Sequence, residues 1–152
     1  MTKTSAQFQQ YIVEQSKCQP LFFCGDTISI LKELPPESID FCMTSPPYYG
    51  QRQYSSGGIG LEKTYREYIN NLLSICKQVH QVLKPKGSFW LNLGDTYDTK
   101  TLIGIPWRIA IALTDQQGWI LRNSVIWNKV KGGPDNSLDR LRNIHENLFH
   151  FV

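Results

Sequence analysis

Residues 39–50 read IDFCMTSPPYYG, an apolar run that ends abruptly in two prolines and two tyrosines. The apolar part, Ile39–Met43, predicts a buried strand. Pro46 and Pro47 have a fixed φ and no backbone N–H, so neither a strand nor a helix can continue through them. Carbonyl oxygens in this turn lose their usual partners and can face a ligand. Because a serine hydroxyl precedes the prolines and two aromatic rings follow them, the stretch suits the binding of a flat ring that bears an amino group.

The composition indicates a single globular domain. Of the 152 residues, 41% are hydrophobic and 19% are charged, which excludes the disordered and membrane classes. The formal net charge of +3 is compatible with a polyanionic partner but does not establish one. No stretch approaches the roughly 20 apolar residues of a membrane span, and no apolar secretory segment follows Met1. We therefore expect a cytoplasmic protein without a membrane partner.

The cysteines and histidines predict no metal site. Cys18, Cys24, Cys42 and Cys76 lie far apart and form no C-x-x-C pair, and the three histidines do not cluster. We expect reduced thiols, with Cys42 and Cys76 on core faces.

Helices and strands alternate along the predicted chain. The expected helices are Thr4–Gln15, Thr27–Leu34, Thr64–Leu83 and a segment from Pro106 to Gly118, and the expected strands are Leu21–Cys24, Ile39–Met43, Ser88–Leu93, Trp119–Trp127 and Glu146–Val152. The segment Thr64–Leu83 has the clearest helical period, with apolar residues at spacings of three and four. This alternation predicts a parallel, right-handed α/β sheet.

Polar residues stand at the ends of three predicted strands. They are Asp26, the turn Ser45–Tyr48, and the pair Asn92 and Asp95. In parallel α/β sheets, ligands bind beyond the carboxyl ends of the strands. The sequence therefore predicts one site on this rim.

Several motifs together resemble the amino-methylating DNA methyltransferases. They are the turn Thr44–Tyr48, Gly25-Asp26 with Leu31, and the stretches Ile59–Glu62, Leu83–Ser88, Leu91–Asp95, Gly104–Arg108, Ile126–Lys129 and His145-Glu146. The chain is most similar to the cytosine-N4 group, in which the catalytic motifs precede the cofactor motif. The resemblance implies a partial Rossmann-like, S-adenosylmethionine-dependent methyltransferase fold, with a mostly parallel sheet and flanking helices. Residues 1–19 would be an N-terminal helical extension, and residues 20–152 the catalytic half of the domain.

The chemistry that the resemblance implies takes place on a base flipped out of double-stranded DNA. Tyr48 would stack on the base, while the Ser45 hydroxyl and the Pro46 carbonyl, in a turn stiffened by Pro47, accept hydrogen bonds from its exocyclic amine. S-adenosylmethionine would donate the methyl group by in-line displacement. No covalent enzyme intermediate is needed, which agrees with the absence of a Pro-Cys dipeptide.

The resemblance also assigns residues to the cofactor and to DNA. Asp26 would contact the adenine part of the cofactor, with Thr44, Asn92 and Asp95 on the rim around it. DNA contacts are expected from Tyr49, Arg52, Lys129 and Lys131. For the two lysines a second interpretation stays open, because a loop rich in Gly, Pro and Asn can simply be solvated surface.

Two sequence features that are expected in members of this family are missing. The cofactor fingerprint F-x-G-x-G after a strand is absent. The only G-x-G, Gly58-Ile59-Gly60, follows a loop and is interpreted as a flexible turn. No region for reading a DNA sequence is evident. We therefore expect the catalytic half of a bacterial, archaeal or phage restriction–modification enzyme, which a second polypeptide would complete.

Two alternatives to cytosine-N4 methylation stay open. A serine at position 45 favours cytosine N4, whereas Asp or Asn there would favour adenine N6. Adenine-N6 methylation stays open because both amines need the same donor–acceptor geometry. The second alternative is not an enzyme: the chain would be a truncated, non-catalytic remnant or a DNA-binding accessory chain.

Overall fold

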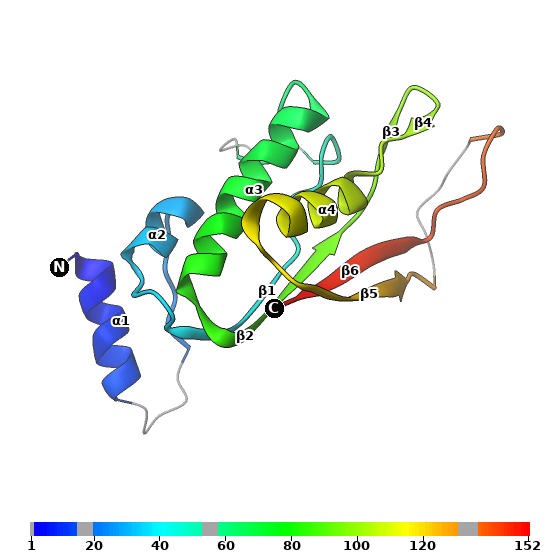
Figure 1. Ribbon diagram of the computed structural model, residues 1–152. Coiled ribbons are helices and arrows are strands. Elements are labelled where there is room, and N and C mark those ends of the chain that lie inside the picture. Colours follow the sequence, from blue (N-terminus) through cyan, green and yellow to red (C-terminus); the bar gives the residue numbers. More distant parts are fainter. Residues whose placement is uncertain (1, 15–19, 53–57, 131–136) are drawn as a thin grey trace.

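The computed structural model describes residues 2–14, 20–52, 58–130 and 137–152 (Figure 1). Its helices are α1 (Lys3–Val13), α2 (Thr27–Glu33), α3 (Tyr65–Val82) and α4 (Ile105–Gln117). Its strands are β1 (Ile39–Thr44), β2 (Leu83–Leu93), β3 (Tyr97–Asp98), β4 (Thr101–Leu102), β5 (Leu121–Asn128) and β6 (His145–Phe151). Within the described segments, no helix is both long and apolar enough to cross a membrane.

The main sheet is mixed and has the strand order β1-β2-β6-β5. Strand β1 is parallel to β2, whereas β6 is antiparallel to both β2 and β5. The predicted parallel direction is therefore correct for β1, β2 and β5 and wrong for β6. A parallel neighbour needs a crossover connection, usually a helix. No helix occurs in the described part of the β5–β6 connection, so β6 returns beside β5 as in a hairpin.

Helix α3 forms where the sequence period predicted it. Thr64 and Glu67 form a capping box, in which the Thr64 hydroxyl accepts from the Glu67 N–H and the Glu67 carboxylate accepts from the Thr64 N–H. The stripe of α3 is buried at Tyr68, Leu72, Leu73, Cys76, Val79 and Val82. Helices α3 and α4 lie on the same face of the sheet (Figure 1), where the buried side chains include Phe89, Leu91, Phe149 and Phe151.

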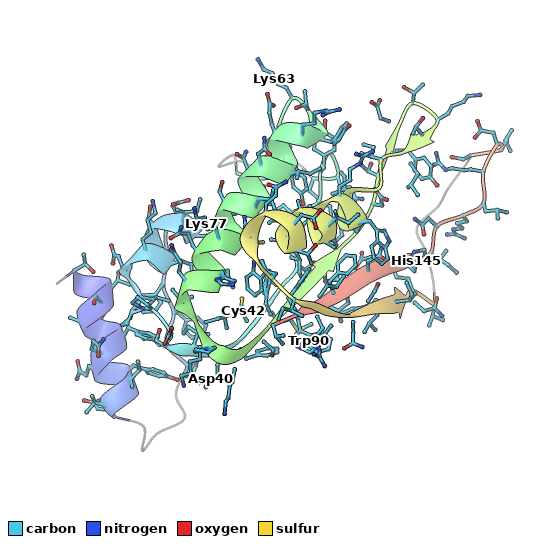
Figure 2. The ribbon with its side chains drawn as sticks, in the orientation of Figure 1. Asp40, Cys42, Lys63, Lys77, Trp90 and His145 are labelled. Carbon is cyan, nitrogen blue, oxygen red and sulfur yellow. The ribbon has the colours of Figure 1, made fainter. Side chains whose placement is uncertain are left out.

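The opposite face of the sheet, called the open face below, is much less covered. The strand pairings place on it Phe41, Met43, Trp90, Val125, Trp127, Leu148 and His150. Figure 2 shows Trp90 on the side away from the helices and Cys42 on the helix side. Phe41 and Trp127 are 54% and 50% exposed, so no described element packs firmly over the open face.

One predicted strand does not form. Leu21–Cys24 alternates half-buried and exposed side chains, as a strand would, but it pairs with no described strand. A strand needs a neighbour for its backbone N–H and C=O groups, which the apolar sequence alone does not provide. The remaining predicted elements are present with shifted ends, although Gln15, the predicted end of the first helix, lies outside the described residues.

Candidate active site

The Ser45–Tyr48 turn follows β1 directly, so it lies at the carboxyl end of that strand. Asn92 lies near the carboxyl end of β2, and Glu146 lies near the amino end of the antiparallel β6. Because β6 runs in the opposite direction, its beginning reaches the same rim as the ends of β1 and β2. The topology thereby brings together residues that are far apart in the sequence.

Four side chains on this rim form one hydrogen-bonded group. The Tyr48 hydroxyl lies 3.0 Å from Ser45 Oγ and donates to Glu146 Oε2 at 2.9 Å. Asn92 Nδ2 lies 2.7 Å from Glu146 Oε2 and 2.9 Å from the Tyr48 hydroxyl oxygen. The serine and tyrosine predicted to be catalytic are therefore in contact, and Asn92, which was predicted on the cofactor rim, contacts the Tyr48 hydroxyl.

Glu146 is the site residue that the sequence prediction missed. Its carboxylate accepts hydrogen bonds from Tyr48, Asn92 and Lys129, and Lys129 also forms an ion pair with it. Burial would raise the pKa of Glu146, but these hydrogen bonds and the Lys129 charge outweigh burial, so the pKa lies below its ordinary value. The carboxylate is therefore ionised at neutral pH. One available signal was that Glu146 is the only acidic residue in the predicted last strand.

Tyr48 is fixed both by its hydroxyl and by its ring. A Cβ atom on Gly94 would lie only 2.7 Å from Tyr48 Cε2, so the ring rests directly against the Gly94 backbone. Burial is the main reason why the pKa of Tyr48 rises to about 12. Tyr48 is thus a neutral phenol, only half-buried, and the exposed part of its ring is available for stacking.

The two prolines have different surroundings. The carbonyl of Pro47 accepts a hydrogen bond from the Tyr68 hydroxyl at 3.0 Å, which ties the turn to α3. In the described part of the chain, no donor is seen at the Pro46 carbonyl. Among the described residues, the Pro46 carbonyl can therefore face a ligand, whereas the Pro47 carbonyl already has a partner. The hydrogen bond from Tyr68 to Pro47 stiffens the turn.

These groups line a hollow of about 300 Å³, at the lower end of the range for ligand pockets. Its lining residues are Ser45, Pro46, Pro47, Tyr48, Gln51, Arg52, Lys129 and Glu146. The hollow offers a hydroxyl, a half-buried ring and a carboxylate paired with an ammonium group. Such a set can hold a small flat ring by its polar edge.

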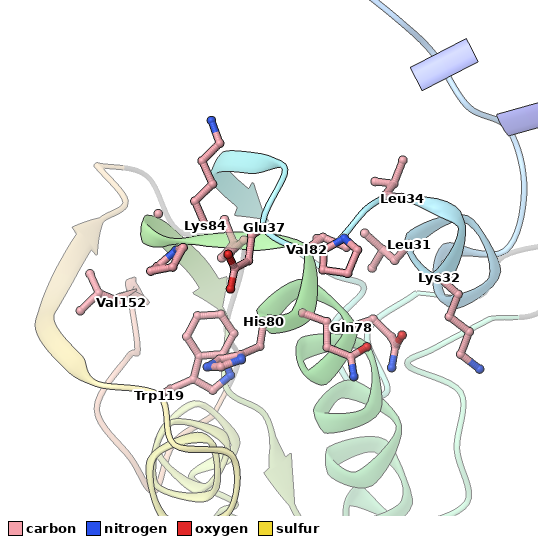
Figure 3. Close-up of a pocket in the computed structure, with 15 residues that line it drawn as sticks. Leu31, Lys32, Leu34, Glu37, Gln78, His80, Val82, Lys84, Trp119 and Val152 are labelled. Atoms are coloured by element: carbon pink, nitrogen blue, oxygen red, sulfur yellow. The ribbon is translucent and has the colours of Figure 1, made fainter. Parts of the chain in front are cut away.

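A larger hollow of about 670 Å³ shares none of these residues (Figure 3). Leu31, His80 and Trp119 are among the residues that line it, together with Leu83 and Lys84 at the start of β2. It therefore lies at the opposite end of β2 from the Ser45 turn. It is therefore separate from the chemistry predicted for the Ser45 turn.

Two carboxylates predicted to contact the cofactor have structural partners. Asp26 caps α2, where its Oδ1 accepts from the Ser29 N–H and the Ser29 hydroxyl; these hydrogen bonds lower the pKa of Asp26. Asp95 Oδ1 accepts from the N–H groups of Thr96, Gly104 and Ile105. Among the described residues, no hydrogen bond joins either carboxylate to Ser45 or Tyr48.

The other predicted contacts surround the turn. Thr44 is the last residue of β1. Tyr49 is half-buried, and its hydroxyl donates to the Lys63 carbonyl. Arg52 is exposed and lines both the Ser45 hollow and an adjoining one of about 740 Å³. Lys129 points to Glu146 rather than only into solvent, and Lys131 lies outside the described residues.

The Gly58–Gly60 segment supports the turn. Gly60 is buried with φ of 103°, which disfavours any residue with a Cβ, and an added Cβ would lie 3.1 Å from the Tyr48 carbonyl oxygen. Its own carbonyl accepts from the Gly50 N–H at 2.9 Å. These contacts agree with the interpretation of Gly60 as part of a turn.

Comparison with known proteins identifies the family. The family model described as DNA methylase (N6_N4_Mtase) matches residues 39–152. The chain is 38% identical over 160 residues to Type II methyltransferase M.XycI of Xanthomonas campestris pv. cyanopsidis, a match that covers 86% of this chain and 53% of that protein. For M.Cfr9I of Citrobacter freundii the identity is 37%, with 84% and 52% covered. The chain thus spans about half the length of these curated relatives.

Solved structures confirm the fold. The PvuII DNA methyltransferase (cytosine-N4-specific) superposes with a TM-score of 0.71 and 28% identity, over 85% of this chain and 47% of that one. TTHA0409 of Thermus thermophilus, solved in complex with S-adenosyl-L-methionine, gives a TM-score of 0.65 at 20% identity, over 84% and 50%, and supports the fold alone. The predicted partial methyltransferase fold and the resemblance are both confirmed, and the chain belongs to the DNA methylase family.

Proposed function

We propose that this chain is the base-binding half of an enzyme that methylates the exocyclic N4 amine of a flipped cytosine in double-stranded DNA. One observation carries the proposal: Ser45, Pro46 and Tyr48 line a single hollow, with Ser45 Oγ 3.0 Å from the Tyr48 hydroxyl. The likeness to the cytosine-N4-specific PvuII enzyme supports it, as does a serine at position 45.

In this proposal, Ser45 and Pro46 act on the amine, and Tyr48 acts on the ring. The Ser45 hydroxyl oxygen and the Pro46 carbonyl accept the two N–H groups of the amine, which directs its lone pair away from the ring. The exposed part of Tyr48 stacks on the base, an interaction worth about 1–3 kcal/mol. Glu146 holds the Tyr48 hydroxyl at 2.9 Å and so keeps the phenol in position.

The methyl group would come from S-adenosylmethionine, which supplies an electrophilic carbon bonded to a sulfonium. On this chain the fit for the cofactor rests on Asp26, an exposed side chain that uses only Oδ1 to cap α2. Its second carboxylate oxygen accepts no hydrogen bond from the described residues and can receive one from the cofactor. We place Thr44 and Asn92 on the neighbouring rim, and we assign Asp95 a supporting role because of its three backbone partners.

The proposal includes a second polypeptide that supplies the cofactor-binding half. The chain corresponds to about half of its curated relatives, and the F-x-G-x-G fingerprint is absent from its sequence. We assign residues 20–152 to the catalytic half, working with that partner in a cytoplasmic restriction–modification system. The name Type II methyltransferase, shared by the relatives, supports this setting.

The test uses labelled S-adenosylmethionine, DNA and the purified chain, alone and with a co-expressed second half. Mass spectrometry of the nucleosides should find N4-methylcytosine only when both halves are present. Ser45→Ala should abolish the product, whereas Ser74→Ala, which removes an exposed hydroxyl on α3, should not. N6-methyladenine as the product, or full activity of the chain alone, would contradict the proposal.

A further inference from the structure

The segment that joins β5 to β6 carries two fully exposed leucines, called the leucine pair below. Leu138 is 102% and Leu141 92% exposed, although leucine is among the residues that proteins most often bury. Both lie in residues 137–144, which lead directly into β6. Two such side chains on one short segment indicate a contact with a partner rather than ordinary surface.

The leucine pair stands close to the hollow that contains Ser45. The Lys129 N–H donates to the Ile144 carbonyl at 2.8 Å, which closes the neck of the segment. Lys129 and Glu146, on the two sides of this neck, both line the Ser45 hollow. Leu141 precedes Glu146 by five residues, so even a fully extended chain would separate them by no more than about 18 Å. A partner that delivers a base to the hollow therefore comes within reach of the leucine pair.

The β3–β4 hairpin holds this segment in place. The Arg140 guanidinium lies 3.8 Å from the centroid of the Tyr97 ring, and Lys100 forms an ion pair with Asp139 at 3.3 Å. Figure 1 shows the hairpin and the segment extending from the same end of the sheet. Because the two anchored residues, Asp139 and Arg140, stand between the leucines, the leucine pair is held outward before a partner binds. Such preorganisation lowers the entropy cost of binding.

The charge of the segment favours DNA as the partner. Residues 129–144 contain two acidic side chains and four basic ones, which are Lys129, Lys131, Arg140 and Arg142. Basic groups around exposed apolar side chains suit a duplex, because the basic groups can face phosphates while the apolar ones enter the stacked bases. The half that would bind the cofactor belongs instead near Thr44 at the end of β1, and β1 and β5 are opposite edges of the sheet.

We propose that the leucine pair enters the base stack of the duplex and fills the gap that the flipped cytosine leaves. This inference rests on the proposed function for its premise that a base leaves the stack. Flipping breaks stacking and pairing, and an apolar side chain in the gap lies against the unstacked bases and so lowers this cost. Leu141, the nearer of the two to Glu146 in the sequence, occupies the gap, and Leu138 contacts the neighbouring base step.

The test measures, by fluorescence anisotropy without cofactor, the binding of two duplexes that differ only in an abasic site. The chain is used alone and with its co-expressed second half. Because an abasic site is a gap already made, that duplex should bind about tenfold or more tightly than the fully paired one. Leu141→Ala should reduce this preference to less than about twofold. Leu141→Met keeps a long apolar side chain and should keep the preference.

Val13→Ala is the matched control, since Val13 is 82% exposed but lies on α1, far from the β5–β6 segment (Figure 1). It should leave both dissociation constants unchanged. All of these substitutions replace exposed side chains, and circular dichroism should show that the variants are folded.

Three results would overturn the inference: equal affinity for the two duplexes, no binding of either, or a preference that survives in the double variant Leu138→Ala/Leu141→Ala. If that double variant kept the preference but no longer bound the second half, the leucines would belong to a protein interface instead. A preference that depends on Leu141, found with paired halves that form no N4-methylcytosine, would support the inference and contradict the proposed function. Formation of N4-methylcytosine without any preference for the abasic duplex would do the reverse.

Discussion

At the scale of single residues, two opposing effects set the pKa of Glu146. Burial raises it, while hydrogen bonds from Lys129, Asn92 and Tyr48 and the Lys129 charge lower it further than burial raises it. Because the pKa is lower in the folded protein than in the unfolded chain, ionised Glu146 stabilises the fold above the ordinary carboxyl pKa. This contribution is lost as the pH falls through the lowered folded-state value.

Removing the Lys129 ammonium should therefore raise the pKa of Glu146. In Lys129→Met the effect of burial remains, while the hydrogen bond and the charge disappear. Carbon-13 NMR of labelled glutamate should show the Glu146 resonance titrating at higher pH in the variant. The matched control is Lys100→Met, which breaks the exposed Lys100–Asp139 pair and should leave that resonance unchanged. An unchanged Glu146 titration in Lys129→Met would show that the lysine does not set this pKa.

Gly94 provides a way to disturb Tyr48 without changing a charge. In Gly94→Ala the new Cβ would lie 2.7 and 2.8 Å from two carbons of the Tyr48 ring, so the ring must move. We expect a loss of about 1–3 kcal/mol in the free energy of unfolding, as for other overpacked sites. A crystal structure of the variant should show Tyr48 Oη displaced from Glu146.

The control for this substitution is Gly25→Ala, whose Cβ would meet only the tip of the flexible Ile30 side chain, at 3.3 Å. Urea denaturation should give a change within about 0.5 kcal/mol. An unmoved Tyr48 in Gly94→Ala would contradict the close packing described here.

At the scale of elements, the start of α4 depends on a residue outside that helix. Its N-cap is Gly104, which has no side chain to accept the first N–H groups. Asp95 Oδ1 instead accepts from Gly104 and Ile105, and also from Thr96. Asp95 thus performs the task of a capping residue from the loop after β2.

Asp95→Ala should destabilise the chain by about 1–3 kcal/mol, because buried backbone donors lose their acceptor. Urea denaturation without cofactor is the measurement, since only a structural role predicts a loss under that condition. Asp98→Ala, which removes an exposed carboxylate that accepts a hydrogen bond from its neighbour Thr99, should change the stability by less than about 0.5 kcal/mol. Full stability of Asp95→Ala would return this residue to a ligand-binding role.

Elements were predictable where the local pattern sufficed. The apolar stripe was enough to predict α3, and the proline pair after Met43 was enough to predict the end of β1. Leu21–Cys24 was wrongly predicted as a strand because pairing depends on a neighbour that a local pattern does not contain. The direction of β6 was wrong for a similar reason, since the connection rather than the strand sequence sets it.

At the scale of the whole molecule, the members of the site were easier to predict than their arrangement. Ser45 and Tyr48 share one short motif, and the strand-end rule placed Asn92 on the same rim. Glu146 stands 98 residues after Tyr48, its hydrogen-bond partner. No local motif joins the two, so only the antiparallel return of β6 reveals the contact.

A chain with an open sheet face should gain stability when that face is covered. At a partner concentration 100 times the dissociation constant, binding to the folded state adds about 2.7 kcal/mol, which raises the melting temperature of this chain by about 5–10 °C. Calorimetry of the mixture should show this shift, and Met43→Lys should reduce it. A melting temperature that does not depend on partner concentration would exclude specific binding.

The 98-residue separation between Tyr48 and Glu146 also bears on the order of events during folding. Contacts between distant parts of a chain form slowly, because loop-closure entropy is lost before such contacts stabilise the chain. Helix α3 can acquire its turns early from local interactions, while the phenol meets its carboxylate only after the final strand has joined the sheet. A refolding time course should therefore show helical ellipticity appearing before the tyrosine absorbance change, and a molecule that stops midway would have α3 but not the pocket at Ser45.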